Sequence, residues 1–161
     1  MAGGGQLRLR YSLDSDAVIQ AWIDYPIDFF PKVWESLHQL AKDDVVGIAP
    51  VIYEELERGG DELFDWVKTR KGDFVVENSD ELQEAVTYLV NTYSNFGLIT
   101  GKNEGDPYVV ALAMVEDCLV VTNESMTNNM NGPKVPDVCR AEGIRWTKFV
   151  DIIRNEDLDV G

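Results

Sequence analysis

The sequence is short of basic residues. Its 161 residues include 14 Lys and Arg against 29 Asp and Glu, which gives a formal net charge of -15. A chain of this charge is repelled by nucleic acids and anionic membranes, so bulk electrostatic attraction to either is disfavoured. Any chemistry on phosphate groups must therefore be local, with a metal ion or a partner supplying positive charge.

Long apolar runs and cysteine are also scarce. Runs such as Val109–Val115 are far shorter than the roughly 20 residues that a membrane span needs, so we expect no membrane contact. Residues 1–7 are Gly-rich and lack a basic stretch followed by an apolar block, so we expect no signal peptide. The two cysteines, Cys118 and Cys139, form no Cys-x-x-Cys pair. We expect buried thiols in a cytoplasmic protein, with a single disulfide as the alternative.

The rest of the composition is that of a globular protein. The chain is 45% apolar and 10% aromatic, and its length corresponds to about one domain with one core. We expect a single domain over residues 7–154. Residues 1–6 are expected to be a disordered or cloning-derived tail, and residues 155–161 a fraying tail.

Strand-like and helix-like segments alternate along this domain. Apolar stretches predict strands at residues 7–13, 45–49, 118–122 and 144–146. Helical spacing of apolar residues predicts helices at 17–23, from 31 onward, at 50–58, from 61 onward, and at 80–93, 106–117, 136–142 and 148–154. Such alternation predicts an α/β fold with a parallel sheet that helices cover on both faces.

Two helix boundaries and one loop have clear local signals. Asp106 before Pro107 is typical of a helix N-cap with Pro at the first helical position. Thr147 is expected to cap the last helix. The segment Ser125–Lys134 is Asn-rich and contains Asn-Gly-Pro, so it predicts an exposed loop.

Acidic residues lie where the predicted strands end. Those closest to strand ends or to the start of the adjoining helix are Asp14, Asp16, Glu54, Glu55, Asp106 and Glu124. Ligands of parallel sheets bind beyond the carboxyl ends of the strands, so these acids are expected at one rim. Two carboxylates about 4 Å apart repel each other by about 4 kcal/mol at an effective dielectric constant of 20. Bound Mg²⁺ or Mn²⁺, which prefer oxygen ligands, would reverse that sign, so we expect an acidic metal pocket.

Each acid also has a structural interpretation. Asp14 and Asp16 can cap the helix that follows the first strand, and Asp106 can cap its own helix. The acids within residues 54–57 fit a solvated helix face. The acids all lie at the ends of predicted strands or helices. Helix capping alone does not require this common position, so the position favours the metal pocket.

Four segments in order resemble the motifs of PIN-domain nucleases, over about residues 8–154. Tyr11–Ile19 resembles the opening motif, a strand that ends in Asp and leads into an apolar helix. Glu55–Gly59 resembles the second motif, Gly105–Ala113 the third, and Leu119–Glu124 the fourth. The pattern Lys134-Val-Pro-Asp-Val-Cys139 is similar to that of a PIN-like group, the DUF4411 family.

The resemblance implies a three-layer α/β/α sandwich that hydrolyses RNA with Mg²⁺ or Mn²⁺. The catalytic and metal-binding positions that it implies are Asp14, Glu55, Asp106 and Glu124, with Asp16 as a further candidate ligand. Its supporting positions fall on Ser15, Thr122 and Asn123. Asp16 stands where the family usually has Asn, and Glu124 where it usually has Asp.

Similarity to VapC-type toxins further implies an antitoxin partner and a homodimer. Because the net charge opposes RNA binding, we expect weak, salt-sensitive RNA capture around Arg58, Lys102 and Lys134.

Two other functions fit parts of the sequence. Asp14-Ser15-Asp16 matches the nucleophile motif of haloacid-dehalogenase-like phosphatases, although Gly105-Asp106 precedes the strand at 118–122 and that family places its Gly-Asp motif last. The other alternative is a catalytically inactive interaction module.

Overall fold

The computed structural model describes residues 9–97 and 104–161. In this part of the chain the strands form one sheet, made of β1 (Tyr11–Leu13), β2 (Val46–Gly47), β3 (Leu119–Val121) and β4 (Trp146–Thr147). All neighbouring strands are parallel, in the order β2-β1-β3-β4. The predicted α/β fold with a parallel sheet is therefore confirmed.

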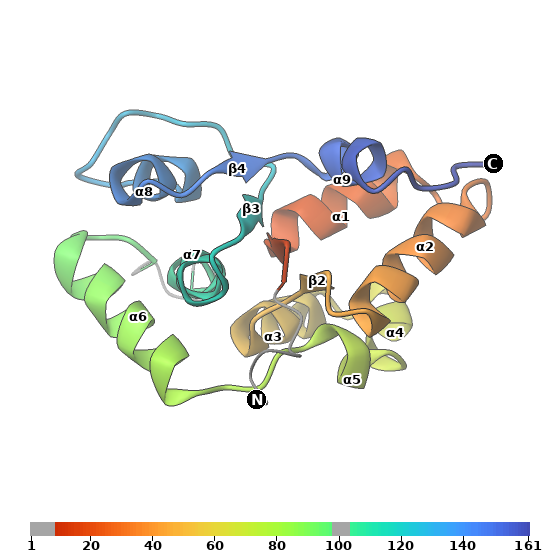
Figure 1. Cartoon of the computed structure of the whole chain (residues 1–161), viewed down its shortest axis with the longest axis horizontal. Helices are drawn as coiled ribbons and strands as arrows, with labels where there is room; N and C mark the ends of the chain where they lie inside the picture. The colour runs from red at the N-terminus through yellow and green to blue at the C-terminus, as the bar shows by residue number, and fades with distance from the viewer. Residues whose placement is uncertain (1–8, 98–103) are drawn as a thin grey trace.

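Helices cover both faces of the sheet. Their bounds are α1 (Ser15–Asp24), α2 (Pro31–Lys42), α3 (Pro50–Gly59), α4 (Glu62–Lys68), α5 (Lys71–Phe74), α6 (Asp80–Thr92), α7 (Asp106–Glu116), α8 (Val135–Glu142) and α9 (Phe149–Asn155). Figure 1 shows α6, α7 and α8 on one side of the strands and α1, α2, α4 and α9 on the other. This is the three-layer arrangement that the motifs imply.

The strands are shorter than the apolar runs predict. Within the run at 45–49, Val46 and Gly47 pair with β1, while the next residue, Ile48, pairs instead with Val75. Val75 directly follows α5, a single short helix that the periodicity does not predict. The apolar run therefore changes partner along its length, which hydrophobicity alone cannot reveal.

The most buried helix, α7, connects the core to the carboxyl end of the sheet. It packs against β1 and β3 on one side and α6 on the other, and every residue from Val109 to Ala113 is buried. The Ser12 hydroxyl donates a 2.8 Å hydrogen bond to the Val109 carbonyl and so joins α7 to β1. Because α7 is fixed in this way, its first residue, Asp106, is held at the edge where the strands end.

Helix caps agree with the sequence signals only in part. Asp61 caps α4, since its carboxylate accepts a hydrogen bond from the Phe64 N–H. Thr147 does not cap α9; it belongs to β4, and Lys148 occupies the N-cap position. The Thr147 hydroxyl instead donates to the carboxylate of Asp151, the third residue of that helix.

The segment after α9 is attached to the body of the fold. Glu156 accepts hydrogen bonds from the Arg10 guanidinium and the Tyr11 hydroxyl, and Lys32 pairs with Asp159. Glu156 and Asp159, within the tail expected at residues 155–161, therefore contact the folded domain. The expected tail at 1–6 lies outside the described residues.

The two cysteines form no disulfide bond. Cys118 and Cys139 are both free, and burial raises the pKa of each thiol to about 12, so the disulfide alternative is wrong. Across residues 9–97 and 104–161, no helix combines the length and apolar character needed to cross a bilayer.

Candidate metal-binding site

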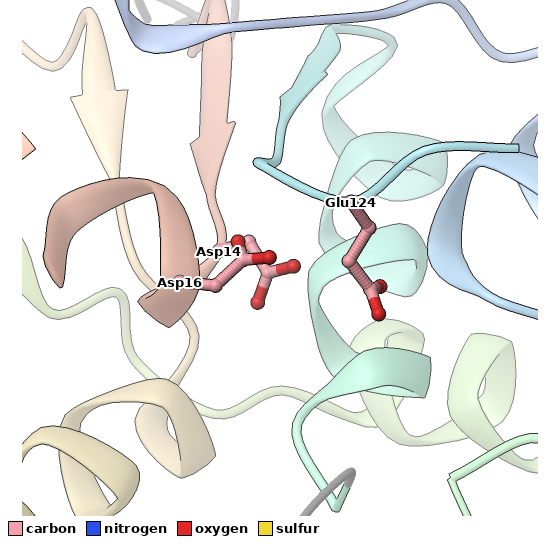
Figure 2. Close-up of side chains that lie close together, drawn as sticks. All are labelled: Asp14, Asp16 and Glu124. Atoms are coloured by element: carbon pink, nitrogen blue, oxygen red, sulfur yellow. The ribbon is translucent and has the colours of Figure 1, made fainter. Parts of the chain in front are cut away.

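Three carboxylates meet at the carboxyl end of the sheet. Asp14, Asp16 and Glu124 each contribute an oxygen atom, and these atoms all lie within 4.8 Å of one another. Figure 2 shows the three side chains close together, at the end of β1, in the first turn of α1 and in the segment after β3. The structure therefore brings together acids that are up to 110 residues apart, as their positions at strand ends predict.

Asp14 is placed by the sheet itself. Its N–H donates to the Val121 carbonyl at 2.8 Å, which continues the pairing of β1 with β3 by one residue. Its carboxylate is 3% exposed and accepts a 2.8 Å hydrogen bond from the Thr122 hydroxyl. Asp14 occupies the N-cap position of α1, but its side chain makes no capping hydrogen bond. The capping interpretation is therefore wrong for this residue.

Asp16 joins the first turn of α1 to the segment after β3. One oxygen, Oδ1, accepts a 3.0 Å hydrogen bond from the Asn123 N–H and lies 3.4 Å from the Thr122 hydroxyl. Asp16 thus belongs to the acidic cluster more directly than the sequence motifs imply.

Glu124 is held from three directions. Its N–H donates to the Thr122 hydroxyl at 3.2 Å. Its Oε1 accepts a 3.2 Å hydrogen bond from the Val135 N–H, and its Oε2 lies 3.6 Å from the Lys134 ammonium. The start of α8 therefore fixes where the Glu124 carboxylate points.

Asp106 lies beside these three acids and has no capping role. Gly105 is the N-cap of α7 and Asp106 is the first helical residue, so the N-cap predicted from Asp106-Pro107 is wrong by one position. Asp106 is 7% exposed, and its carboxylate accepts no hydrogen bond from any residue in the described parts of the chain. Burial, followed by the charges of Glu124 and Glu55, raises its pKa to about 8.

Glu55 approaches the site but is held by hydrogen bonds outside the compact cluster. Its carboxylate accepts one from the Ser15 hydroxyl at 2.9 Å and one from the Gly105 N–H at 3.1 Å. A Cβ atom at position 105 would lie 2.5 Å from Glu55 Oε1, so only glycine allows this approach. Glu54 is exposed on α3, as the solvated-face interpretation predicts for it.

The electrostatics of the site oppose full ionisation. Burial raises the pKa of Asp14 well above its ordinary range, and the neighbouring carboxylates of Asp16 and Asp106 raise it further. Burial also raises the pKa values of Glu55 and Glu124. Buried carboxylates without a counter-charge favour protonation or a bound cation.

These residues fit a divalent metal ion. The donor set consists of hard carboxylate oxygens, the type of ligand that Mg²⁺ and Mn²⁺ prefer. The Asp106 carboxyl lies close enough to the cluster that the charges of Glu124, Glu55 and Asp16 add to burial in raising its pKa. A bound cation would reverse this unfavourable interaction.

The predicted RNA-binding cations have acidic partners where they are described. Arg58 pairs with Glu104 at 3.2 Å, and Lys134 pairs with Glu124. Lys102 lies outside the described residues. Lys134 is thus part of the acidic site itself, 46% exposed at its rim.

The groups that hold the acids in place are not evident from the sequence. The N–H groups of Gly105 and Val135 are backbone donors, which no side-chain pattern reveals. Asp137 has no role of its own in the sequence motifs, yet it organises the loop that carries Lys134. An acid at the third position of a helix that begins with Val-Pro is a capping signal, and it could have identified this residue.

The parallel sheet with helices on both faces is the PIN-like fold that the four motifs predict. The chain belongs to the family described as "Domain of unknown function (DUF4411)", whose sequence profile matches residues 11–160.

Two solved structures are similar to this chain. VapBC-1 from nontypeable Haemophilus influenzae is 17% identical with a TM-score of 0.55, over 88% of this chain and 99% of that chain. VapBC2 from Rickettsia felis, in a structure bound to a DNA fragment from the VapBC2 promoter, is 18% identical with a TM-score of 0.55, over 88% of this chain and 99% of that chain. No curated protein matches the chain in sequence.

Proposed function

We propose that this protein is a metal-dependent endoribonuclease. The observation that carries the proposal is the convergence of Asp14, Asp16 and Glu124 within 4.8 Å, with the buried Asp106 beside them. The choice of RNA rests on the resemblance to PIN-domain nucleases, which agrees with the PIN-like fold.

The carboxylates of Asp14, Asp16 and Glu124 would hold a Mg²⁺ or Mn²⁺ ion, with Asp106 and Glu55 as neighbouring acids. When bound, such an ion lowers the pKa of a water molecule and stabilises the negative charge that develops during phosphodiester hydrolysis. The chain's own groups orient these acids: the Thr122 hydroxyl bonds to Asp14, and the Asn123 N–H to Asp16.

Substrate binding would use the few cations near the site. The Lys134 ammonium stands at the rim of the cluster, where it can contact a phosphate oxygen of RNA. Arg58, 48% exposed on α3, is a second candidate, and Lys102 remains a candidate from the sequence. With so few cations and a net charge of -15, binding is expected to be weak and salt-sensitive.

The biological role that we propose is that of the toxin in a toxin–antitoxin pair. The support is the fold shared with the VapBC proteins, together with the acidic site at the carboxyl end of the sheet. An antitoxin segment that carries Arg or Lys would pair with these carboxylates and compete with metal. A homodimer, a single domain over residues 7–154 and a cytoplasmic location complete the proposal.

The test is RNA cleavage by the purified protein with Mn²⁺, compared between wild type and Asp14→Asn. We expect the wild type to cleave and Asp14→Asn to lose activity while its circular dichroism spectrum is unchanged. Glu54→Gln is the matched control, since it removes one exposed carboxylate from α3 and should cleave normally.

Three outcomes would contradict the proposal. Full activity of Asp14→Asn would remove the acidic cluster from the mechanism. Trapping of a phosphoryl group on Asp14 would identify the haloacid-dehalogenase-like reaction. Absence of both Mn²⁺ binding and cleavage in the wild type would leave the inactive interaction module.

A further inference from the structure

The loop between β3 and α8, residues 125–134, is exposed along most of its length but tightly anchored at one point. That point is the carboxylate of Asp137, which lies in the first turn of α8 and is 3% exposed. A buried carboxylate must be satisfied by donors, so the identity of those donors shows what it organises.

Asp137 accepts four hydrogen bonds, all from the loop and its junction with α8. Oδ1 accepts from the N–H groups of Thr127 and Asn128, both at 2.8 Å. Oδ2 accepts from the Thr127 hydroxyl at 2.6 Å and from the Lys134 N–H at 2.9 Å. Both ends of the loop are therefore tied to one side chain. These hydrogen bonds hold the pKa of Asp137 below its ordinary value, despite its burial.

The same junction holds Glu124. The residue bound by Asp137, Lys134, pairs through its ammonium with Glu124 Oε2, and the next N–H, that of Val135, donates to Glu124 Oε1. Both contacts to the Glu124 side chain thus come from the two residues at the start of α8. If this junction moves, Glu124 loses the two groups that hold its carboxylate near Asp14 and Asp16.

We propose that Asp137 is a positioning residue for the acidic site: by clamping the loop at Thr127 and Lys134, it places Glu124 in the metal cluster. The inference rests on the proposed metal-dependent function and adds a residue that does not touch the metal. It predicts that the loop and the metal site are coupled, so that loosening one weakens the other.

The experiment measures the Mn²⁺ dissociation constant by calorimetry at pH 7.5 for the wild type and the variants. Asp137→Asn replaces an acceptor of four hydrogen bonds with a group that also donates, and we expect Mn²⁺ binding to weaken by about tenfold or more. Amide hydrogen exchange in residues 124–135, followed by mass spectrometry, should become faster.

If Asp137→Asn fails to fold, a second pair of variants tests whether the loop contacts of Asp137 affect metal binding. Thr127→Val keeps the branched shape of the side chain but removes the hydroxyl that donates to Oδ2, whereas Thr127→Ser retains the hydroxyl. We expect Thr127→Val to weaken Mn²⁺ binding and Thr127→Ser to bind within about twofold of wild type, because the hydroxyl is the side-chain group of Thr127 that bonds to Asp137, and both variants keep the backbone N–H.

Asp151→Asn is the matched control. Asp151 occupies the same third position in α9 and accepts hydrogen bonds from the Thr147 hydroxyl and the Lys148 N–H, but it makes no contact with Glu124 in the described structure. We expect it to lower stability without changing the Mn²⁺ dissociation constant.

The inference is overturned if Asp137→Asn and Thr127→Val both bind Mn²⁺ as the wild type does. It is also overturned if Asp151→Asn weakens binding as much as Asp137→Asn, because general loosening would then explain both. Wild-type protein that binds no Mn²⁺ would refute the proposed function as well, which separates that failure from failure of the clamp alone.

Discussion

The buried carboxyl of Asp106 makes a prediction about stability that does not depend on any activity. Its pKa of about 8 in the folded protein compares with an ordinary value of 3.8. Because the folded-state pKa is raised, the carboxyl favours folding only while it is protonated. Its contribution is complete below pH about 4, decreases as the pH rises, and is lost above pH about 8.

The magnitude follows from the two pKa values. One pKa unit corresponds to about 1.4 kcal/mol, so the full cost of ionising Asp106 in the folded protein is about 6 kcal/mol, of which about 4 kcal/mol applies at pH 7. Asn has nearly the same shape as the neutral acid and never ionises. We therefore expect Asp106→Asn to stabilise the metal-free protein by between about 1 and 4 kcal/mol at pH 7, the upper value being a limit that relaxation of the site reduces.

The assay is urea unfolding with EDTA present, at pH 4, 6 and 8, for the wild type and Asp106→Asn. The stabilisation should be small at pH 4 and grow with pH. Glu54→Gln controls for the loss of one negative charge, because Glu54 is exposed on a neighbouring helix. If Asp106→Asn stabilises no more than Glu54→Gln at pH 8, or if its effect does not depend on pH, the reasoning about a buried ionisable group is refuted.

Two further predictions concern the same edge of the sheet. In calorimetric scans, Mn²⁺ should raise the midpoint of thermal unfolding at pH 7.5, and EDTA should reverse the rise. The rise should be smaller at pH 5, because protons compete with metal for carboxylates whose pKa values are raised. An equal rise at both pH values would contradict this prediction. Gly105→Ala should destabilise the protein by about 1–3 kcal/mol in urea unfolding, because the alanine Cβ would lie 2.5 Å from Glu55 Oε1 and 2.7 Å from Ile52 Cδ1. Unchanged stability would show that the Glu55 side chain can move aside freely.

Much of the fold was predictable because its signals are local. Pro31, Pro50 and Pro107 each lie in the first turn of a helix, and Gly60 and Gly143 end helices in the left-handed conformation that glycine adopts at no steric cost. Apolar runs marked the strands for the same reason. The runs did not indicate where each strand stops pairing, because that depends on the partner: Gly47 pairs with β1, whereas the next residue, Ile48, pairs with Val75.

The candidate site was predicted in outline and corrected in detail. Strand ends placed Asp14, Asp106 and Glu124 at one edge, because parallel topology alone requires it. The motifs placed Glu55 among the metal ligands and Asp16 as a further candidate, whereas the compact cluster contains Asp16 and not Glu55. The difference lies in hydrogen bonds from Ser15 and from a backbone N–H, which hold Glu55 away from the compact cluster.

The acidic edge is better explained by a ligand than by the structural roles that its members could have had. An Asp that caps a helix accepts hydrogen bonds from backbone N–H groups, as Asp61 and Asp137 do here. Asp14 and Asp106 accept no such bond from the described residues, yet they are among the most buried acids of that part of the chain. Their burial raises their pKa values and opposes folding at neutral pH, which is the opposite of a capping contribution. A feature that costs stability and serves no local purpose is expected where selection acts on binding, so the placement of these few charges is more informative than the net charge of -15.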